Sequence, residues 1–397
     1  MTEQILPEVR LKPREEDRVM GGHLWVFSNE IAEHPKGLEP GELVRILSDR
    51  GAFLGVGFYN PASLIALRVL SRQGEAPGPM FFQERLAKAL AYRRETLPGE
   101  DSFRLCYGES DSLPGLVIDK YANVLVAQVL SAGMERYWPA IQQALVELFD
   151  PKGILLRNDN ELRKLEGLAT GVSVAYGDVP DTLEITDGGL RFQMAPASGQ
   201  KTGYYLDQRL NRQFLKPFFK DRAVLDLYCY LGSFSVTAAK AGAERVLGVD
   251  SSEPALGLAR TNALLNGVEE ICRFERGDAE DIMTQVIEAS KEGRPDFILL
   301  DPPNLVPNKK SLPKAVKAFE RINGLAIKGL KRGGYLATSS CSHHLSREDF
   351  VEMLRAAARR TGRQVRLVAL RGASPDHPVL LSMPETEYLN FALLQVV

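Results

Sequence analysis

Short apolar runs separated by turn residues fill the first part of the chain. The runs are read as strands because they are rich in β-branched and aromatic residues and end at turn signals, residues 48–51 and Asn60-Pro61. Such closely spaced strands predict a compact β-barrel over residues 1–73, followed by a linker of Gly and Pro residues at 73–79. The predicted strands are 43–47, 53–59 and 64–70.

A mixed pattern follows over residues 80–190. Helix-like runs at 81–96 and 134–149 alternate with strand-like runs, and Ile141, Leu145 and Leu148 form one apolar stripe of the second helix. Strands grouped around single helices are typical of an α+β domain. The predicted strands are 116–118, 124–130, 153–156 and 172–174, with a hairpin that turns at 187–189.

From about residue 216 the rhythm changes to strand, loop, helix. One helix shows it plainly, because residues 348–361 carry apolar side chains at the spacing of a single helical face. This alternation predicts an α/β fold with a Rossmann-like, doubly wound sheet over residues 191–397. Its strands are expected at 223–227, 245–250, 272–276, 297–301, 335–340, 365–370 and 388–396.

Composition places the chain among globular proteins with two or three domains: 397 residues, 44% hydrophobic, 25% charged and a net charge of −2. No run of about 18 apolar residues occurs, so we expect no membrane span. The first residues lack the pattern of a secretion signal, which favours a cytoplasmic location. Four cysteines without a CxxC pair or a histidine cluster predict neither a metal site nor a disulfide framework.

Two reactive side chains follow two of the predicted strands. Cys341 comes at the end of one strand, and Asp301-Pro302-Pro303 follows the strand about forty residues earlier. Ligands bind at the carboxyl ends of strands in open parallel sheets, so a thiol and a carboxylate there form a candidate reaction centre. The alternative for Cys341 is a buried, inert cysteine, but polar neighbours such as Ser340 and Ser342 argue against burial.

Three acidic residues end or follow three consecutive strands. Asp226 could accept a hydrogen bond from an ammonium group, Asp250 could hold ribose hydroxyls, and Asp278 lies where an adenine edge could bind. Gly232 allows close approach to a ligand, yet no GxGxxG phosphate motif is present. This set favours S-adenosylmethionine as the cofactor, with helix capping by the Asp residues as the alternative.

These residues together with a longer set of motifs resemble a known family. The motifs are residues 199–212, 225–230, Ser340-Cys341-Ser342 and 376–379. The set resembles the large-subunit ribosomal RNA cytosine-5 methyltransferases of the "I" type, which are class I S-adenosylmethionine-dependent enzymes. The resemblance covers essentially the whole chain, and it implies a PUA domain at residues 1–73 and a small middle domain before the catalytic domain.

The resemblance also implies roles for single residues. Cys341 matches the nucleophile of the family, and Asp301 matches the carboxylate beside it. One departure is the pair Asn304-Leu305 after Asp-Pro-Pro, which is closer to the motif of amino-group methylases. The candidate cofactor-binding residues are Asp226, Tyr228, Gly232, Asp250, Ser251, Asp278, Ala279, Asp301, Tyr205 and Gln208.

A basic and aromatic segment precedes the predicted sheet and is a candidate RNA contact. Stacking rings beside cationic side chains suit RNA, and packing of a linker onto the sheet is the alternative. The candidate RNA-binding residues are Lys201, Tyr204, Arg209 and Arg212.

The sequence therefore predicts an enzyme that uses S-adenosylmethionine and no metal to form 5-methylcytosine in large-subunit ribosomal RNA through a covalent bond from Cys341 to C6. One alternative is a methyltransferase acting on an exocyclic amine or a small molecule without Cys341. The other is a non-catalytic RNA-binding protein. The target nucleotide stays open, and so does the oligomeric state, for which a homodimer is one candidate.

Overall fold

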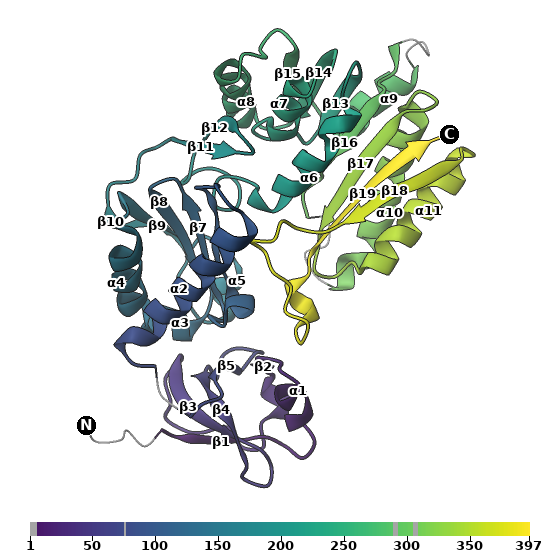
Figure 1. Ribbon diagram of the computed structural model, residues 1–397. Helices are drawn as coiled ribbons and strands as arrows, with labels where there is room; N and C mark the ends of the chain where they lie inside the picture. Colours follow the sequence, from purple (N-terminus) through teal and green to yellow (C-terminus); the bar gives the residue numbers. More distant parts are fainter. Residues whose placement is uncertain (1–5, 75–76, 289–292, 305–308) are drawn as a thin grey trace. The chain divides into compact units, whose positions relative to one another are not determined.

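The computed structural model describes residues 6–74, 77–288, 293–304 and 309–397 (Figure 1). Contacts group the chain into two compact units. The first comprises residues 1–181, 196–203 and 375–386, and the second comprises residues 182–195, 204–374 and 387–397. The predicted linker at 73–79 lies partly outside the described residues. No helix in the described part of the chain is long and apolar enough to cross a membrane.

The first unit begins with a five-stranded sheet of order β1-β3-β4-β5-β2. β1 and β3 pair in parallel, and every other pair of neighbouring strands in this sheet is antiparallel. Val9, Val44, Ile46 and Val69 lie in its buried core. The elements are β1 (Glu8–Arg10), α1 (Glu16–Met20), β2 (Trp25–Val26), β3 (Glu42–Leu47), β4 (Phe53–Tyr59) and β5 (Leu67–Ser71).

A second five-stranded sheet, of order β10-β9-β8-β7-β6, completes the secondary structure of this unit. The helix expected at 134–149 is two helices, which meet at Tyr137. Pro139 lies in the first turn of the second helix, where its missing N–H costs nothing. The elements are α2 (Pro79–Thr96), β6 (Phe103–Tyr107), β7 (Leu116–Tyr121), β8 (Val124–Val129), α3 (Ala132–Arg136), α4 (Trp138–Phe149), β9 (Gly153–Arg157), α5 (Leu162–Leu165) and β10 (Val172–Gly177).

Buried charges join the two sheets of the first unit. Arg68 on β5 pairs with Glu109 at 3.2 Å and with Glu166 at 3.0 Å. Phe58 packs so closely that a Cβ at Gly133 would lie 2.0 Å from its ring. The first two predicted domains are therefore one compact unit, and the boundary near residue 80 stays a prediction.

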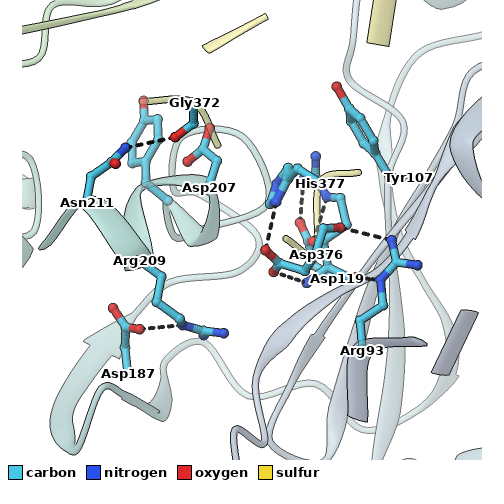
Figure 2. A network of polar contacts seen from close by, with 12 residues as sticks. Arg93, Tyr107, Asp119, Asp187, Asp207, Arg209, Asn211, Gly372, Asp376 and His377 are labelled. Carbon is cyan, nitrogen blue, oxygen red and sulfur yellow. Dashed lines mark hydrogen bonds and ion pairs between the residues drawn. The ribbon is translucent and has the colours of Figure 1, made fainter. Parts of the chain in front are cut away.

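Residues 375–386 return to the first unit from the end of the chain. The buried carboxylate of Asp376 accepts a hydrogen bond from the backbone N–H of Arg104 at 2.9 Å, and its carbonyl oxygen accepts one from Arg93 at 2.9 Å (Figure 2). His377 Nδ1 lies 3.1 Å from the same carboxylate, and its ring packs against Tyr107. The hydrogen bonds of Asp376 and the ring contact of His377 thus hold this segment within the first unit.

The second unit is built on a seven-stranded sheet of order β15-β14-β13-β16-β17-β19-β18. Its first five strands are parallel, and β19 is antiparallel to both of its neighbours. The doubly wound α/β fold is confirmed. The strands are β13 (Ala223–Leu227), β14 (Arg245–Asp250), β15 (Cys272–Arg276), β16 (Phe297–Leu300), β17 (Tyr335–Cys341), β18 (Val365–Arg371) and β19 (Leu389–Val396).

Helices are packed against this sheet. The apolar face of α10 packs with α9 and α11 over Leu225, Leu227 and Leu300 of the sheet. The other helices, α6, α7 and α8, contact one another in sequence order. The helices are α6 (Arg209–Leu215), α7 (Ser233–Lys240), α8 (Glu253–Leu265), α9 (Ala279–Glu288), α10 (Leu312–Gly329) and α11 (Arg347–Thr361).

A β-hairpin belongs to the second unit although the sequence placed it at the end of the middle domain. It consists of β11 (Leu183–Asp187) and β12 (Leu190–Met194). Asn262 on α8 binds both backbone polar groups of Gln193, at 2.6 and 3.2 Å. The predicted boundary at residue 190 thus falls within a hairpin that packs as a whole in the second unit.

Candidate active site at the strand ends

A thiol and a carboxylate lie at the carboxyl ends of β17 and β16. These two strands pair in parallel, so their carboxyl ends meet at one edge of the sheet. The Ser339 hydroxyl donates a hydrogen bond to the Asp301 carboxylate, and Cys341, two residues further along β17, points to the same face. Cys341 is half-buried, so its side chain is not sealed in the interior.

Tyr205 is close enough to both groups to be affected by their charges. Burial raises the pKa of its hydroxyl, and negative charge on Asp301 or Cys341 acts in the same direction. The ring of Tyr230 meets the Tyr205 ring edge-on at a centroid distance of 5.4 Å. The structure therefore brings the predicted nucleophile, the predicted carboxylate and one predicted cofactor residue together.

The buried carboxyl group of Asp226 ends the neighbouring strand β13. It accepts a hydrogen bond from the Ser235 hydroxyl at 2.6 Å. Burial raises its pKa to about 7, and the charges of Asp301 and Asp250 act in the same direction. Acidic groups from three strands thus converge at one edge of the sheet, where a cationic ligand would lower their mutual repulsion.

Asp250 and Asp278 bind backbone N–H groups near the same edge. Asp250 accepts hydrogen bonds from the N–H groups of Tyr230 and Ser252, both at 2.9 Å. Asp278 accepts two from the first turn of α9, at 2.8 and 3.2 Å, and so caps that helix. Asp278 is therefore a helix cap, which was the alternative to cofactor binding, although its carboxylate has further lone pairs that could bind a ligand. The cofactor contacts of both residues stay predictions.

The loop between β13 and α7 has an unusual backbone. Tyr228, Tyr230 and Gly232 have φ of 63°, 48° and 71°. A Cβ at Gly232 would lie 2.9 Å from the Phe274 ring, so this glycine is needed for packing and for its left-handed conformation. Non-glycine residues held at positive φ cost energy and are concentrated at functional sites. Burial raises the pKa of the Tyr228 hydroxyl, and the charge of Asp278 raises it further.

Gln208 offers an unused donor in the interior of this unit. Its Oε1 accepts a hydrogen bond from Asn211 at 2.7 Å, whereas its buried Nε2 has no partner in the part of the chain that is described. Of the other predicted cofactor residues, Ala279 is buried and Ser251 is exposed. An unsatisfied buried donor and an acidic edge fit S-adenosylmethionine, whose amino-acid part carries an ammonium group and a carboxylate.

Three of the four predicted RNA-binding residues are buried instead. Arg209 and Arg212 each pair with Asp187 at 2.5 Å, and the Tyr204 hydroxyl donates to the same carboxylate at 2.9 Å (Figure 2 labels the Asp187–Arg209 pair). Arg209 and Arg212 are 1% exposed and Tyr204 is 2% exposed, so the prediction that they contact RNA is wrong. They hold the β-hairpin of Asp187 to α6. Lys201 is half-buried, and its RNA contact stays a prediction.

Asp207 and Tyr388 are site residues that the sequence analysis did not single out. The Tyr388 hydroxyl donates to the buried Asp207 carboxylate at 2.5 Å, and the His343 ring packs against the Tyr388 ring at 5.3 Å. The charge of Asp207 also raises the pKa of Tyr205. In the sequence, the one indication that Asp207 contributes to the site is its position within the 199–212 motif.

The remaining cysteines, Cys106, Cys229 and Cys272, are buried. Burial raises the pKa of Cys272 to about 12 and holds those of Cys106 and Cys229 well above the usual range. Their thiols are therefore poor nucleophiles. No group of three or more His, Cys, Asp or Glu side chains suited to a metal ion occurs in the described ranges.

Comparisons with known proteins agree with both parts of the fold. Residues 9–72 match the model of a PUA-like domain, and residues 169–365 match that of an S-adenosylmethionine-dependent methyltransferase. S-adenosylmethionine as the cofactor is thereby confirmed.

Solved structures show the same fold at low sequence identity. A provisionally assigned SAM-dependent methyltransferase from Streptococcus mutans has a TM-score of 0.83 at 18% identity, covering 98% of this chain and 100% of that one. A provisionally assigned methyltransferase complexed with SAH has a TM-score of 0.85 at 19% identity, with the same coverage. At this level of identity the likeness supports the fold alone.

Sequence relatives match over nearly their whole length. Ribosomal RNA large subunit methyltransferase I of Pseudoalteromonas atlantica is 37% identical over 98% of this chain and 99% of its own. The protein of that name from Klebsiella pneumoniae is 36% identical over 98% of both chains. The chain therefore belongs to the ribosomal RNA large subunit methyltransferase I family.

Proposed function

We propose that this protein forms 5-methylcytosine in large-subunit ribosomal RNA, and that Cys341 is the nucleophile. The name of its relatives supports the RNA substrate, since the match runs through nearly the full length of both chains. The observation that carries the mechanism is the half-buried thiol of Cys341, which lies near Tyr205 on the face of β17 that Ser339 shares. A PUA-like domain in the same chain is consistent with an RNA substrate.

The chemistry requires a thiol at this place. Carbon 5 of cytosine is a weak nucleophile, and addition of a thiolate at C6 raises the electron density at C5. Bound S-adenosylmethionine supplies the electrophilic methyl group. After transfer, a base takes the C5 proton, the electrons of the C5–H bond form the C5–C6 double bond, and the C6–S bond breaks to return the thiolate and restore the aromatic ring. Only cysteine combines strong nucleophilicity with partial ionisation near neutral pH.

Asp301 would stabilise the charge that develops on the ring. A carboxyl group at N3 of the base can donate or share a proton as the thiolate adds. The hydrogen bond from Ser339 fixes the orientation of this carboxyl group on the face that Cys341 also uses. The target base must leave its stack to reach these groups.

Methylation of an exocyclic amine is the second candidate. The sequence Asp301-Pro302-Pro303-Asn304 favours it, because such enzymes bind the amino group with this type of motif and need no thiol. Asn304 is exposed, and Leu305, which follows it, lies outside the described residues.

Nucleoside mass spectrometry of large-subunit ribosomal RNA separates these candidates. We expect 5-methylcytidine at one position in cells that contain the protein, its loss on deletion, and no rescue by Cys341→Ser. Rescue by Cys341→Ser would favour the amine candidate. So would the loss of an N-methylated nucleoside, rather than of 5-methylcytidine, when the protein is deleted. The cytoplasmic location and the homodimer expected from the sequence stay predictions. The first follows from the proposed substrate.

A further inference from the structure

A cavity of about 750 Å³ lies in the first unit, and none of the candidate active-site residues lines it. Its lining comes from the end of β5 and the residues after it, from helix α2, and from residues 110–112 and 378–379. Figure 1 shows where α2 and β5 lie in the fold. The volume is within the range of ligand sites, about 300–1,000 Å³.

The lining carries more positive than negative charge. Arg72, Arg85 and Lys88 line the cavity, and Asp111 is the one carboxylate among the lining residues of the described chain. The carboxylate of Asp111 already has a partner, because Arg93, which does not line the cavity, pairs with both of its oxygens. The three cations are therefore left without a carboxylate of their own in the cavity.

Arg85 is the most constrained of these cations. Its guanidinium group donates to the carbonyl oxygen of Leu70 at 2.6 Å and to that of Ser112, and no carboxylate pairs with it among the described residues. Burial lowers its pKa to about 10. A partly buried guanidinium group held by carbonyl oxygens, with its charge uncompensated, favours an anionic ligand.

Helix α2 presents an aromatic ring beside these charges. Arg85, Lys88 and Tyr92 recur at spacings of three and four residues, so they share one face of the helix. Tyr92 is 38% exposed, and Lys88 is exposed without an ion pair in the described chain. Cations that can meet phosphates, next to a ring on which a base can stack, are the usual surface for single-stranded nucleic acid.

We propose that this cavity binds a single-stranded segment of the RNA substrate, with phosphates at Arg72, Arg85 and Lys88 and a base stacked on Tyr92. The identity of the RNA rests on the proposed function, whereas the chemistry of the site rests on the cavity alone. A free nucleotide also carries a phosphate and a base, so the test must distinguish a free nucleotide from single-stranded RNA.

The test uses the full-length protein and a short, labelled single-stranded RNA from the large subunit. Lys88→Glu and Tyr92→Ala are each compared with a matched control outside the lining: Arg94→Glu on the same helix and Tyr176→Ala, a ring that is 37% exposed. We expect Lys88→Glu to weaken binding roughly tenfold and to flatten the slope of log K against log salt by about 0.7 for one lost phosphate contact. Tyr92→Ala should weaken binding about five- to tenfold with little change in that slope.

Both controls should bind like the wild type, and KM for RNA should rise in the two cavity variants while kcat stays constant. Equal binding by all four variants would overturn the proposal. So would loss of adenosine monophosphate binding in Lys88→Glu with unchanged RNA affinity, since the site would then hold a free nucleotide. Binding through Lys88 and Tyr92 without methyl transfer by the wild type would refute the proposed function and leave the cavity assignment intact.

Discussion

Binding of S-adenosylmethionine should release a proton from Asp226. In the free protein, burial and the nearby charges of Asp301 and Asp250 raise the pKa of this carboxyl group to about 7. The group is therefore mainly protonated at pH 6. If the ammonium group of the cofactor binds here, it will favour the ionised form and lower this pKa.

The size of the effect follows from the raised pKa. With a pKa of about 7, roughly 0.9 of the free protein is protonated at pH 6, so binding should release about 0.9 proton there and about 0.1 at pH 8. Affinity should fall about tenfold for each pH unit below 7, until the pKa of the complex is reached. The Ser235 hydroxyl donates to the ionised form, so Ser235→Ala should raise the pKa and move the profile to higher pH.

The same shift affects the free energy of unfolding with a definite sign. Because the pKa of folded Asp226 is raised, its contribution to stability is fully present below about pH 4 and is lost as pH rises through 7. The rise from 3.8 to about 7 corresponds to about 4 kcal/mol between these limits, at 1.36 kcal/mol per pKa unit.

Isothermal titration calorimetry in buffers of different ionisation enthalpy measures the released protons. The wild type at pH 6 should show a strong dependence of the observed enthalpy on the buffer, and Asp226→Asn should show almost none. A wild-type enthalpy that is independent of the buffer at pH 6, with normal cofactor binding, would refute this role of Asp226.

Two further variants test the support of the site. Gly232→Ala places a Cβ 2.9 Å from the Phe274 ring at a φ of 71°, so we expect a loss of about 1–3 kcal/mol in unfolding free energy and weaker cofactor binding; unchanged urea denaturation would contradict this. Asp187→Ala leaves Arg209 and Arg212 buried without their carboxylate and should cost about 3–5 kcal/mol, measured by thermal and urea denaturation. The exposed Glu352→Ala is its control, and an equally small effect of both changes would speak against the buried cluster.

The strands that form the site could be predicted because the sequence alternates between strand-like runs, loops and helix-like runs in this part of the chain. All seven strands of the catalytic sheet lie within a residue or two of their expected positions. The rule that parallel strands collect their carboxyl ends at one edge then placed Cys341, Asp301 and Asp226 close to one another. Those parts of the site follow from local pattern and topology alone.

Burial of charged residues could not be predicted in the same way. Arg209, Arg212 and Tyr204 have the composition of an RNA-binding surface, and their spacing gives no sign of Asp187, which approaches from a hairpin about twenty residues earlier. The sequence predicts that hairpin as part of the middle domain, because a turn signal shows that two strands pair but not which helix they pack on. Contacts between segments that are distant in the sequence determine both the burial of these three residues and the helix on which the hairpin packs.

The break between α3 and α4 illustrates a missed local signal. Pro139 cannot donate a backbone hydrogen bond inside a helix, and it lies in the first turn of α4. The cavity beside α2 needed the structure, since its lining comes from segments that are more than 280 residues apart in the chain, from Arg85 to Pro378.

The central claim is that Cys341 bonds covalently to the target base. RNA carrying 5-fluorocytidine at the target position cannot lose a proton from C5, so an enzyme with this mechanism should stay attached to it in the presence of S-adenosylmethionine. Intact-protein mass spectrometry should show one protein–RNA adduct that maps to Cys341 and is absent in Cys341→Ala. Methylation of unmodified RNA without any adduct on the fluorinated RNA would contradict the account.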